Sequence, residues 1–227
     1  GSDWCWWYGD DHSSDNDAVF DALFRKHLKN VYQLINQPVP KQLDVPIKKI
    51  GAIRPIKEPT YLIYPILDGE LTNYFEWLAA GYFDFAGAKG AMHQVETILQ
   101  GIYYGFSLES LYLRFEVGFS LDIDEAKEFS FGCYIISPHH YKAELSFDDQ
   151  ARKYRLDLEG KELDTFGLKR IIEVGIKFAD LQVKAGDKVE FQVFAARKGL
   201  EVEKWPRGGV FSLTVPADNY AEEQWSV

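Results

Sequence analysis

The chain has 227 residues, of which 46% are hydrophobic, 26% are charged and 15% are aromatic, and its net charge is −10. This length is enough for a sizeable core, and the acidic balance argues against a nucleic-acid partner, whose phosphates need clustered Lys and Arg. Nor does it favour an anionic membrane surface, and no run of eighteen apolar residues is available to span a bilayer.

The first residues contain a dense aromatic cluster. Trp4, Trp6, Trp7 and Tyr8 fall within five positions, and an exposed apolar patch of this kind invites association. We therefore expect the cluster to be covered by the rest of the chain, by a partner or by a domain that lies upstream. The first two residues, Gly-Ser, are either native or a remnant of cloning.

No metal site or disulfide is expected, and the sequence predicts no cofactor. Asp10, Asp11 and His12 are adjacent and do not converge easily on one ion, so we expect them to cap and turn the chain. Cys5 and Cys133 are far apart and each lies among aromatic residues. Both are interpreted as small buried hydrophobes.

A helix is predicted from residue 15 to residue 35. Ser14 and Asp17 form a weak capping box, and Asn36 and Pro38 end the helix. Its apolar residues recur at spacings of three and four, which places them on one face: Phe20, Leu23, Phe24, Leu28, Val31, Tyr32 and Ile35. We expect this face to pack onto another protein surface. Five prolines between residues 38 and 59 then predict an extended, semi-rigid strap.

The stretch from residue 61 to residue 80 is predicted to start the β core. Residues 61–66 are interpreted as a strand, and Asp68-Gly69 as a turn, because Gly takes positive φ without steric cost. Phe75 and Trp77 carry the largest apolar areas nearby, so we interpret them as a core plug. Stacking of Trp77 on a sugar ring is the alternative.

Beyond residue 90 the pattern is that of short strands. Alternating apolar residues predict strands at 91–95, 99–104, 111–117, 129–136, 143–147, 154–158, 172–178, 189–194 and 210–215. Turns are predicted at Gly160, Gly186 and Gly208-Gly209, and the turn before Val189 is typical of a hairpin. Such alternation indicates an antiparallel sandwich with one wet face, on which most strand carboxylates lie.

The sequence offers no recognisable catalytic set. It contains no His-Glu-x-x-His motif, no phosphate-binding glycine loop and no nucleophile-elbow serine. A glycosidase needs two carboxylates about 5–9 Å apart across a cleft, and the 35 acidic residues present many pairs without distinguishing one.

Two segments nevertheless resemble a known family. Residues 1–14, with Trp4-Cys5-Trp6-Trp7-Tyr8, and residues 24–32 are similar to the region that follows the catalytic barrel in family 57 glycoside hydrolases of the amylopullulanase and α-amylase type. The usual sequence of that region in the family is GSDWFWWYGDD, so Cys5 stands where the family has a Phe. Downstream, residues 66–69, 76–77, 90–93, 103–106, 111–114, 203–206 and 215–216 resemble the C-terminal β-sandwich of these enzymes, which is similar to dopamine-monooxygenase-like and family 9 carbohydrate-binding domains.

The resemblance implies that the catalytic residues lie elsewhere. The nucleophilic Glu and the acid Asp of the family belong to motifs upstream of residue 1, so this chain alone is expected to be no enzyme but part of a retaining glycoside hydrolase. In the family the Ser-Asp-Trp segment lies close to the substrate cleft. Asp3, Trp4, Trp6, Trp7 and Tyr8 are therefore the candidate carbohydrate-binding or interdomain residues.

The sequence thus predicts a mainly β protein, an antiparallel β-sandwich preceded by an N-terminal helical connector. Residues 1–59 form the connector and proline-rich strap, and residues 60–227 form the sandwich. The expected role is that of a non-catalytic accessory domain that braces the upstream catalytic barrel of the same polypeptide, with α-glucan as a further candidate partner. The alternative is an independent carbohydrate-binding module that stacks glucan rings on exposed aromatic residues. Neither nucleic acid nor a membrane is expected as a partner.

Overall fold

The structure is a computed structural model, and it describes residues 17–45, 57–85, 98–121, 124–206 and 209–224. These residues fall into two compact units, which we describe separately. The first contains residues 17–45 and Gly209, and the second contains the remaining described residues. No helix in the described ranges is long and apolar enough to cross a membrane.

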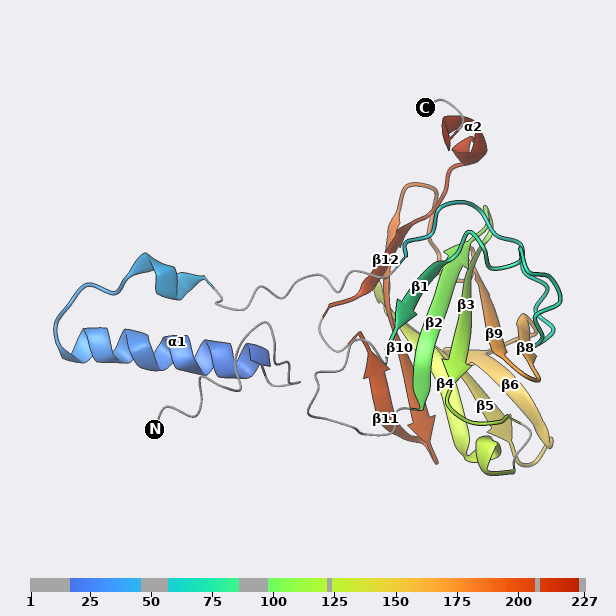
Figure 1. The fold of residues 1–227 in the computed structure, drawn as a ribbon, viewed down its shortest axis with the longest axis horizontal. Coiled ribbons are helices and arrows are strands. Elements are labelled where there is room, and N and C mark those ends of the chain that lie inside the picture. Colours follow the sequence, from blue (N-terminus) through green and yellow to red (C-terminus); the bar gives the residue numbers. More distant parts are fainter. Residues whose placement is uncertain (1–16, 46–56, 86–97, 122–123, 207–208, 225–227) are drawn as a thin grey trace. The chain divides into compact units, whose positions relative to one another are not determined.

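The helical unit consists of α1 (Asp17–Leu34) and the short 3₁₀ helix η2 (Lys41–Asp44), so the predicted helix is confirmed (Figure 1). Asn36 takes the left-handed conformation that ends a helix, with φ of 52°. Lys29 pairs with Asp44 at 2.7 Å and so joins α1 to η2. Much of the predicted apolar face is exposed, so its packing onto another surface stays a prediction. The exposed members of that face are Leu23, Phe24, Val31 and Ile35, and the neighbouring Leu34 is exposed as well.

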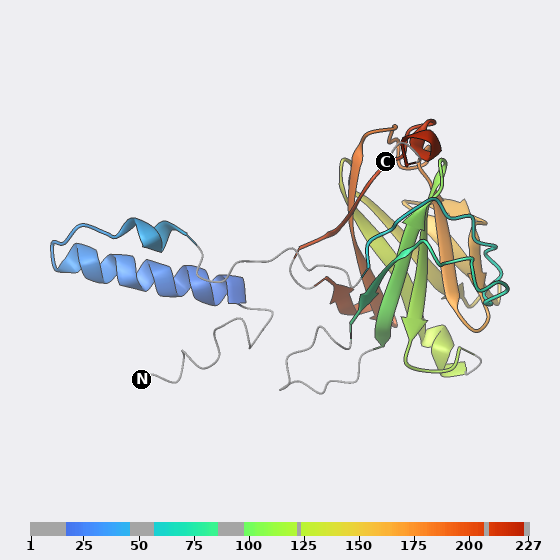
Figure 2. The same cartoon turned by 45° about the horizontal axis from the view of Figure 1, so that its top comes forward.

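The second unit is an antiparallel β-sandwich, as predicted (Figures 1 and 2). One sheet has the spatial order β1 (Gly81–Asp84), β2 (Leu99–Phe106), β3 (Ser110–Val117), β9 (Ile172–Lys177) and β8 (Phe166–Leu168). The other has the order β11 (Leu200–Trp205), β10 (Lys188–Arg197), β4 (Phe129–Ser137), β5 (Tyr141–Asp148), β6 (Lys153–Leu158) and β7 (Lys161–Leu163). The strand β12 (Phe211–Thr214) pairs with β10, and the short helices η3 (Asp124–Glu128) and α2 (Tyr220–Gln224) complete the unit.

Aromatic side chains from the inner faces of the two sheets meet in the core. Tyr104 on β2 contacts Phe191 on β10, with ring centroids 5.8 Å apart, and Phe115 on β3 lies 6.2 Å from Phe131 on β4. Trp205, at the end of β11, stacks on Phe85 at 4.8 Å. Buried residues alternate with more exposed ones along β1 and β12, as the period of two requires. Part of the high aromatic content therefore builds the core.

Two local predictions are wrong. The turn at Gly186 does not close a hairpin, because β9 and β10 belong to different sheets and the turn carries the chain between them. Residues 61–66 are not a strand. Their one described backbone bond to β2 runs from the Ile63 N–H to the Phe106 carbonyl at 2.9 Å. Pro65 has no N–H to donate, and the edge of β2 is taken instead by β1, a strand that was not predicted.

Candidate protein-interaction surface

Residues 57–80, which we call the covering segment, cross the outer side of the five-stranded sheet (Figures 1 and 2). Ile63, Trp77 and Ala80 of this segment form a buried cluster, against which Tyr103 of β2 and Tyr112 of β3 pack. The outer face of this sheet is therefore not the wet face that strand alternation predicts. Trp77 is a core residue, as predicted, and is only 4% exposed, which excludes the alternative of sugar stacking.

A buried carboxylate fixes the covering segment to the sheet. Glu173 of β9 is fully buried and points outward from the sheet, since its neighbours Ile172 and Val174 face the core. One carboxylate oxygen accepts a hydrogen bond from the Trp77 Nε1–H at 3.0 Å, and the other accepts one from the Gly69 N–H at 3.0 Å. Two separate points of the segment are thus tied to one side chain.

The environment of Glu173 disfavours its charge. Burial raises the pKa of the Glu173 carboxyl above its usual value, and the hydrogen bonds from Gly69 and Trp77 lower it by a smaller amount. The nearby carboxylates of Glu76 and Asp68 add to the increase. Arg114 on β3 is the register neighbour of Glu173, but its guanidinium pairs with Glu116 at 2.7 Å. The Glu173 carboxylate is therefore bound by two neutral donors, the Trp77 Nε1–H and the Gly69 N–H. We call this pair of hydrogen bonds the Glu173 anchor.

The covering segment approaches the sheet so closely that backbone touches backbone. A Cβ atom added at Gly167 of β8 would lie 2.4 Å from the Gly69 nitrogen, and one added at Gly69 would lie 2.4 Å from the Lys169 nitrogen. Gly69 also has φ of +77°, as its predicted turn requires. Its carbonyl accepts from the N–H groups of Arg170 and Ile171 at 2.9 and 3.0 Å. This end of the segment is therefore held rigidly.

The outward side of the covering segment carries an exposed apolar surface, which we call the segment surface: Tyr64, Ile66, Leu71, Tyr74, Phe75 and Leu78. Phe75 is 69% exposed, so the prediction that it is buried in the core is wrong. Aromatic side chains bury 150–250 Å² each. With Tyr64, Tyr74 and Phe75 exposed at 65%, 82% and 69%, these three alone leave roughly 300–550 Å² in water.

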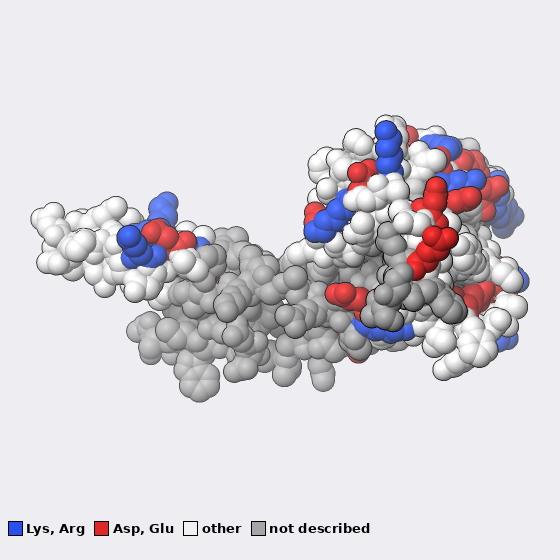
Figure 3. Space-filling view, turned by 90° about the horizontal axis from the view of Figure 1, so that it is seen from above, with Lys and Arg blue, Asp and Glu red and all other residues white. Residues whose placement is uncertain are grey.

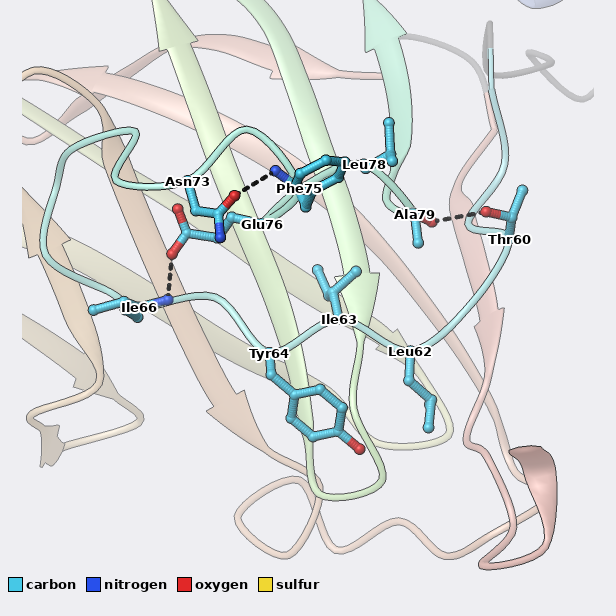
Figure 4. A pocket seen from close by; sticks show the side chains of 10 residues that line it. All are labelled: Thr60, Leu62, Ile63, Tyr64, Ile66, Asn73, Phe75, Glu76, Leu78 and Ala79. Atoms are coloured by element: carbon cyan, nitrogen blue, oxygen red, sulfur yellow. Dashed lines mark hydrogen bonds between the residues drawn. The ribbon is translucent and has the colours of Figure 1, made fainter. Parts of the chain in front are cut away.

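A groove of about 450 Å³ lies within this surface, between residues 60–66 and residues 73–79 (Figure 4). Glu76 crosses it and accepts from the Ile66 N–H at 2.6 Å, which ties the two stretches together. The amide oxygen of Asn73 accepts from the Phe75 N–H at 2.9 Å. The Tyr64 side chain points away from the facing stretch, as Figure 4 shows. The polar groups of the groove thus serve mainly to shape it.

The candidate residues from the sequence lie elsewhere. Asp3, Trp4, Trp6, Trp7 and Tyr8 are all outside the described residues, so their carbohydrate or interdomain role stays a prediction. The predicted strand at 91–95 also falls outside the described residues. Among the residues that the structure describes, no cluster of three or more His, Cys, Asp or Glu side chains could hold a metal ion.

Sequence reasoning missed Glu173, because a carboxylate between apolar strand residues looks like an ordinary member of a solvated face. One signal was present: Gly167 and Gly175 occupy outward positions on adjacent strands, and glycine inside a strand often marks close approach by another backbone.

Charged side chains of both signs are intermixed over the face of the sandwich that Figure 3 shows. Comparison with protein-family models and with curated proteins finds no match to this chain.

Proposed function

We propose that this chain is a non-catalytic accessory domain of an α-glucan-acting glycoside hydrolase, in which the segment surface braces the upstream catalytic barrel. The resemblance of residues 1–14 and 24–32 to family 57 glycoside hydrolases supports the identity of the partner. The single observation that carries the bracing role is the exposed apolar segment surface, held from beneath by the Glu173 anchor.

The size and composition of the segment surface support a protein partner. Its three aromatic side chains and three aliphatic ones together approach the area of about 800 Å² that each partner contributes to a standard interface. Aliphatic residues are interleaved with the aromatic ones, whereas a glucan site needs mainly flat rings. A second copy of this chain would bring another net charge of −10, and like charges oppose association. A different protein surface is the better partner.

A rigid surface also suits bracing. An interface loses less entropy on binding when its residues are already ordered. The covering segment is fixed at Gly69 and Trp77 by Glu173 and at Ile66 by Glu76, so the exposed side chains between them start from an ordered backbone.

Hydrogen exchange tests the bracing role. The amides of residues 60–79 should exchange more slowly in a polypeptide extended upstream by its own coding sequence than in this chain, while those of the remote strand β6 should not change. Unchanged exchange at residues 60–79 would refute bracing, and an upstream sequence without a glycoside hydrolase barrel would refute the proposed parent.

Activity is tested on the chain alone. We expect no turnover of starch, pullulan or maltooligosaccharides. Turnover that is abolished by changing one carboxylate of the chain would contradict the non-catalytic assignment.

A further inference from the structure

A second groove, of about 620 Å³, lies at the opposite edge of the five-stranded sheet from β1, where the chain crosses between the two sheets. The strand β7 ends at Leu163 in one sheet and β8 starts at Phe166 in the other, so only Asp164 and Thr165 make the crossing. We call this the edge groove. Its volume falls within the range of small-molecule sites, which is about 300–1,000 Å³.

The walls of the edge groove are fixed by hydrogen bonds and an ion pair. The Thr165 hydroxyl donates to the Gly175 carbonyl at 2.5 Å, and the Gly175 N–H donates to the Thr165 carbonyl at 2.7 Å. Lys161 on β7 pairs with Asp180 at 2.6 Å, which links the end of one sheet to the turn after β9. The groove is therefore a formed feature of the described sandwich.

Two aromatic side chains line the edge groove. Tyr154 of β6 and Phe166 of β8 both border it, and both are partly exposed. The Tyr154 ring is held edge-on by Phe147, with centroids 5.2 Å apart. The Tyr154 hydroxyl is a neutral donor and acceptor at ordinary pH, as a tyrosine hydroxyl normally is, and burial raises its pKa further. Together with Leu163, the two rings offer apolar surface in a groove whose other lining residues are polar or charged.

The charges around the edge groove balance. Three lysines and three carboxylates line it, so it favours neither an anion nor a cation. Lys161 is occupied by Asp180 as described, and Lys153 lies 3.5 Å from Glu162. Lys177 and Asp164 make no ion pair with any residue of the described ranges. The Lys177 ammonium is therefore available to a ligand as a donor, and the Asp164 carboxylate as an acceptor.

We propose that the edge groove binds a short neutral carbohydrate chain. The C–H faces of sugar rings pack on aromatic side chains, and their hydroxyl groups both donate and accept hydrogen bonds, which matches Tyr154, Phe166, Lys177 and Asp164. The choice of an α-glucan as the ligand rests on the proposed function, whereas the choice of a neutral sugar rests on the groove itself.

The test is a titration of the isotope-labelled chain with maltoheptaose, followed by nuclear magnetic resonance, with cellohexaose as a second neutral sugar and a heparin oligosaccharide as an anionic one. We expect saturable shifts at the groove residues with maltoheptaose. Tyr154→Ala should weaken binding at least fivefold, while Tyr154→Phe, which keeps the ring, should retain most of it. Tyr74→Ala, which removes an exposed ring from the segment surface, is the matched control and should bind like the unmodified chain.

Each outcome decides the proposal. Saturable binding of cellohexaose with the same groove shifts would uphold a neutral-sugar site and overturn the α-glucan choice. No shifts at any sugar concentration, shifts on the segment surface in place of the groove, or preference for heparin would overturn the site. The hydrogen-exchange test of bracing uses residues 60–79 and no sugar, so either hypothesis can fail while the other stands.

Discussion

Replacing Glu173 by glutamine would remove one of the two acceptors that hold the covering segment. The carboxylate accepts from the Trp77 Nε1–H and from the Gly69 N–H, both at 3.0 Å, but a glutamine has only one acceptor oxygen. Its amide group would face the other N–H, leaving a buried donor without a partner, which costs about 1–3 kcal/mol. The change also removes a buried charge, which offsets part of that loss. We therefore expect Glu173→Gln to lower the free energy of unfolding by about 1–2 kcal/mol at neutral pH.

The pH dependence of this loss has a definite sign. The pKa of Glu173 is raised in the folded state by burial, so the protonated form is favoured by folding. The resulting stabilisation is fully present below the unfolded pKa and is lost as pH rises through the folded pKa. The glutamine of the variant cannot titrate. The free energy of unfolding of the unmodified chain should therefore exceed that of the variant by more at acidic pH than at neutral pH.

Urea unfolding at several pH values between the acidic range and neutrality measures both effects. At this chain length the expected loss corresponds to a fall in Tm of about 2–8 °C at neutral pH. Glu70→Gln is the matched control, because Glu70 lies in the same segment, its side chain is 47% exposed, and its pairing with Lys169 is 4.0 Å long. It should change the free energy of unfolding by less than about 0.5 kcal/mol. A Glu173→Gln loss that is absent, or that grows as pH rises, would refute the reasoning.

Two further changes test the covering segment. Thermal unfolding should show a clearly larger loss of stability for Gly69→Ala than for Gly186→Ala. Both glycines have positive φ, but only at Gly69 would the added Cβ lie 2.4 Å from a backbone atom. Equal losses would contradict the close approach of the covering segment to the sheet. Tyr74→Ser combined with Phe75→Ser should lower the binding of a hydrophobic dye and leave the free energy of unfolding within about 0.5 kcal/mol per substitution, since these rings are 82% and 69% exposed; a large loss of stability would show that they pack in solution.

The strands with regular alternation were predictable from the sequence. β3, β4, β5, β6, β9 and β10 were each expected within a few residues of their bounds, because alternation records directly which side of a strand meets the core. The short strands β1, β7 and β8 were missed, since three or four residues carry little alternation, although the four-residue β12 was expected at 210–215. The sequence also could not tell a hairpin from a crossing between sheets at Gly186, because both need the same turn.

The covering segment was the hardest part to predict. Residues 61–66 have strand composition, yet they lie on the outside of a sheet, and Pro65 is the local sign against a paired strand. Trp77 was correctly predicted to be buried and Phe75 was not, although they are two residues apart with similar apolar area. The difference comes from Glu173, 96 residues away from Trp77, which selects the ring that has an N–H to donate. Such a contact has no signature in the local sequence.

The Glu173 anchor separates the residues that make the sandwich stable from those that a partner would recognise. Gly69, Trp77 and Glu173 fix the backbone, whereas the intervening tip from Leu71 to Phe75 points into water. Substitutions in the tip can therefore accumulate at little cost to folding, as they do in the variable loops that other β-sandwiches display. A library randomised at Leu71, Tyr74 and Phe75 would use this sandwich as a scaffold for new binding specificities.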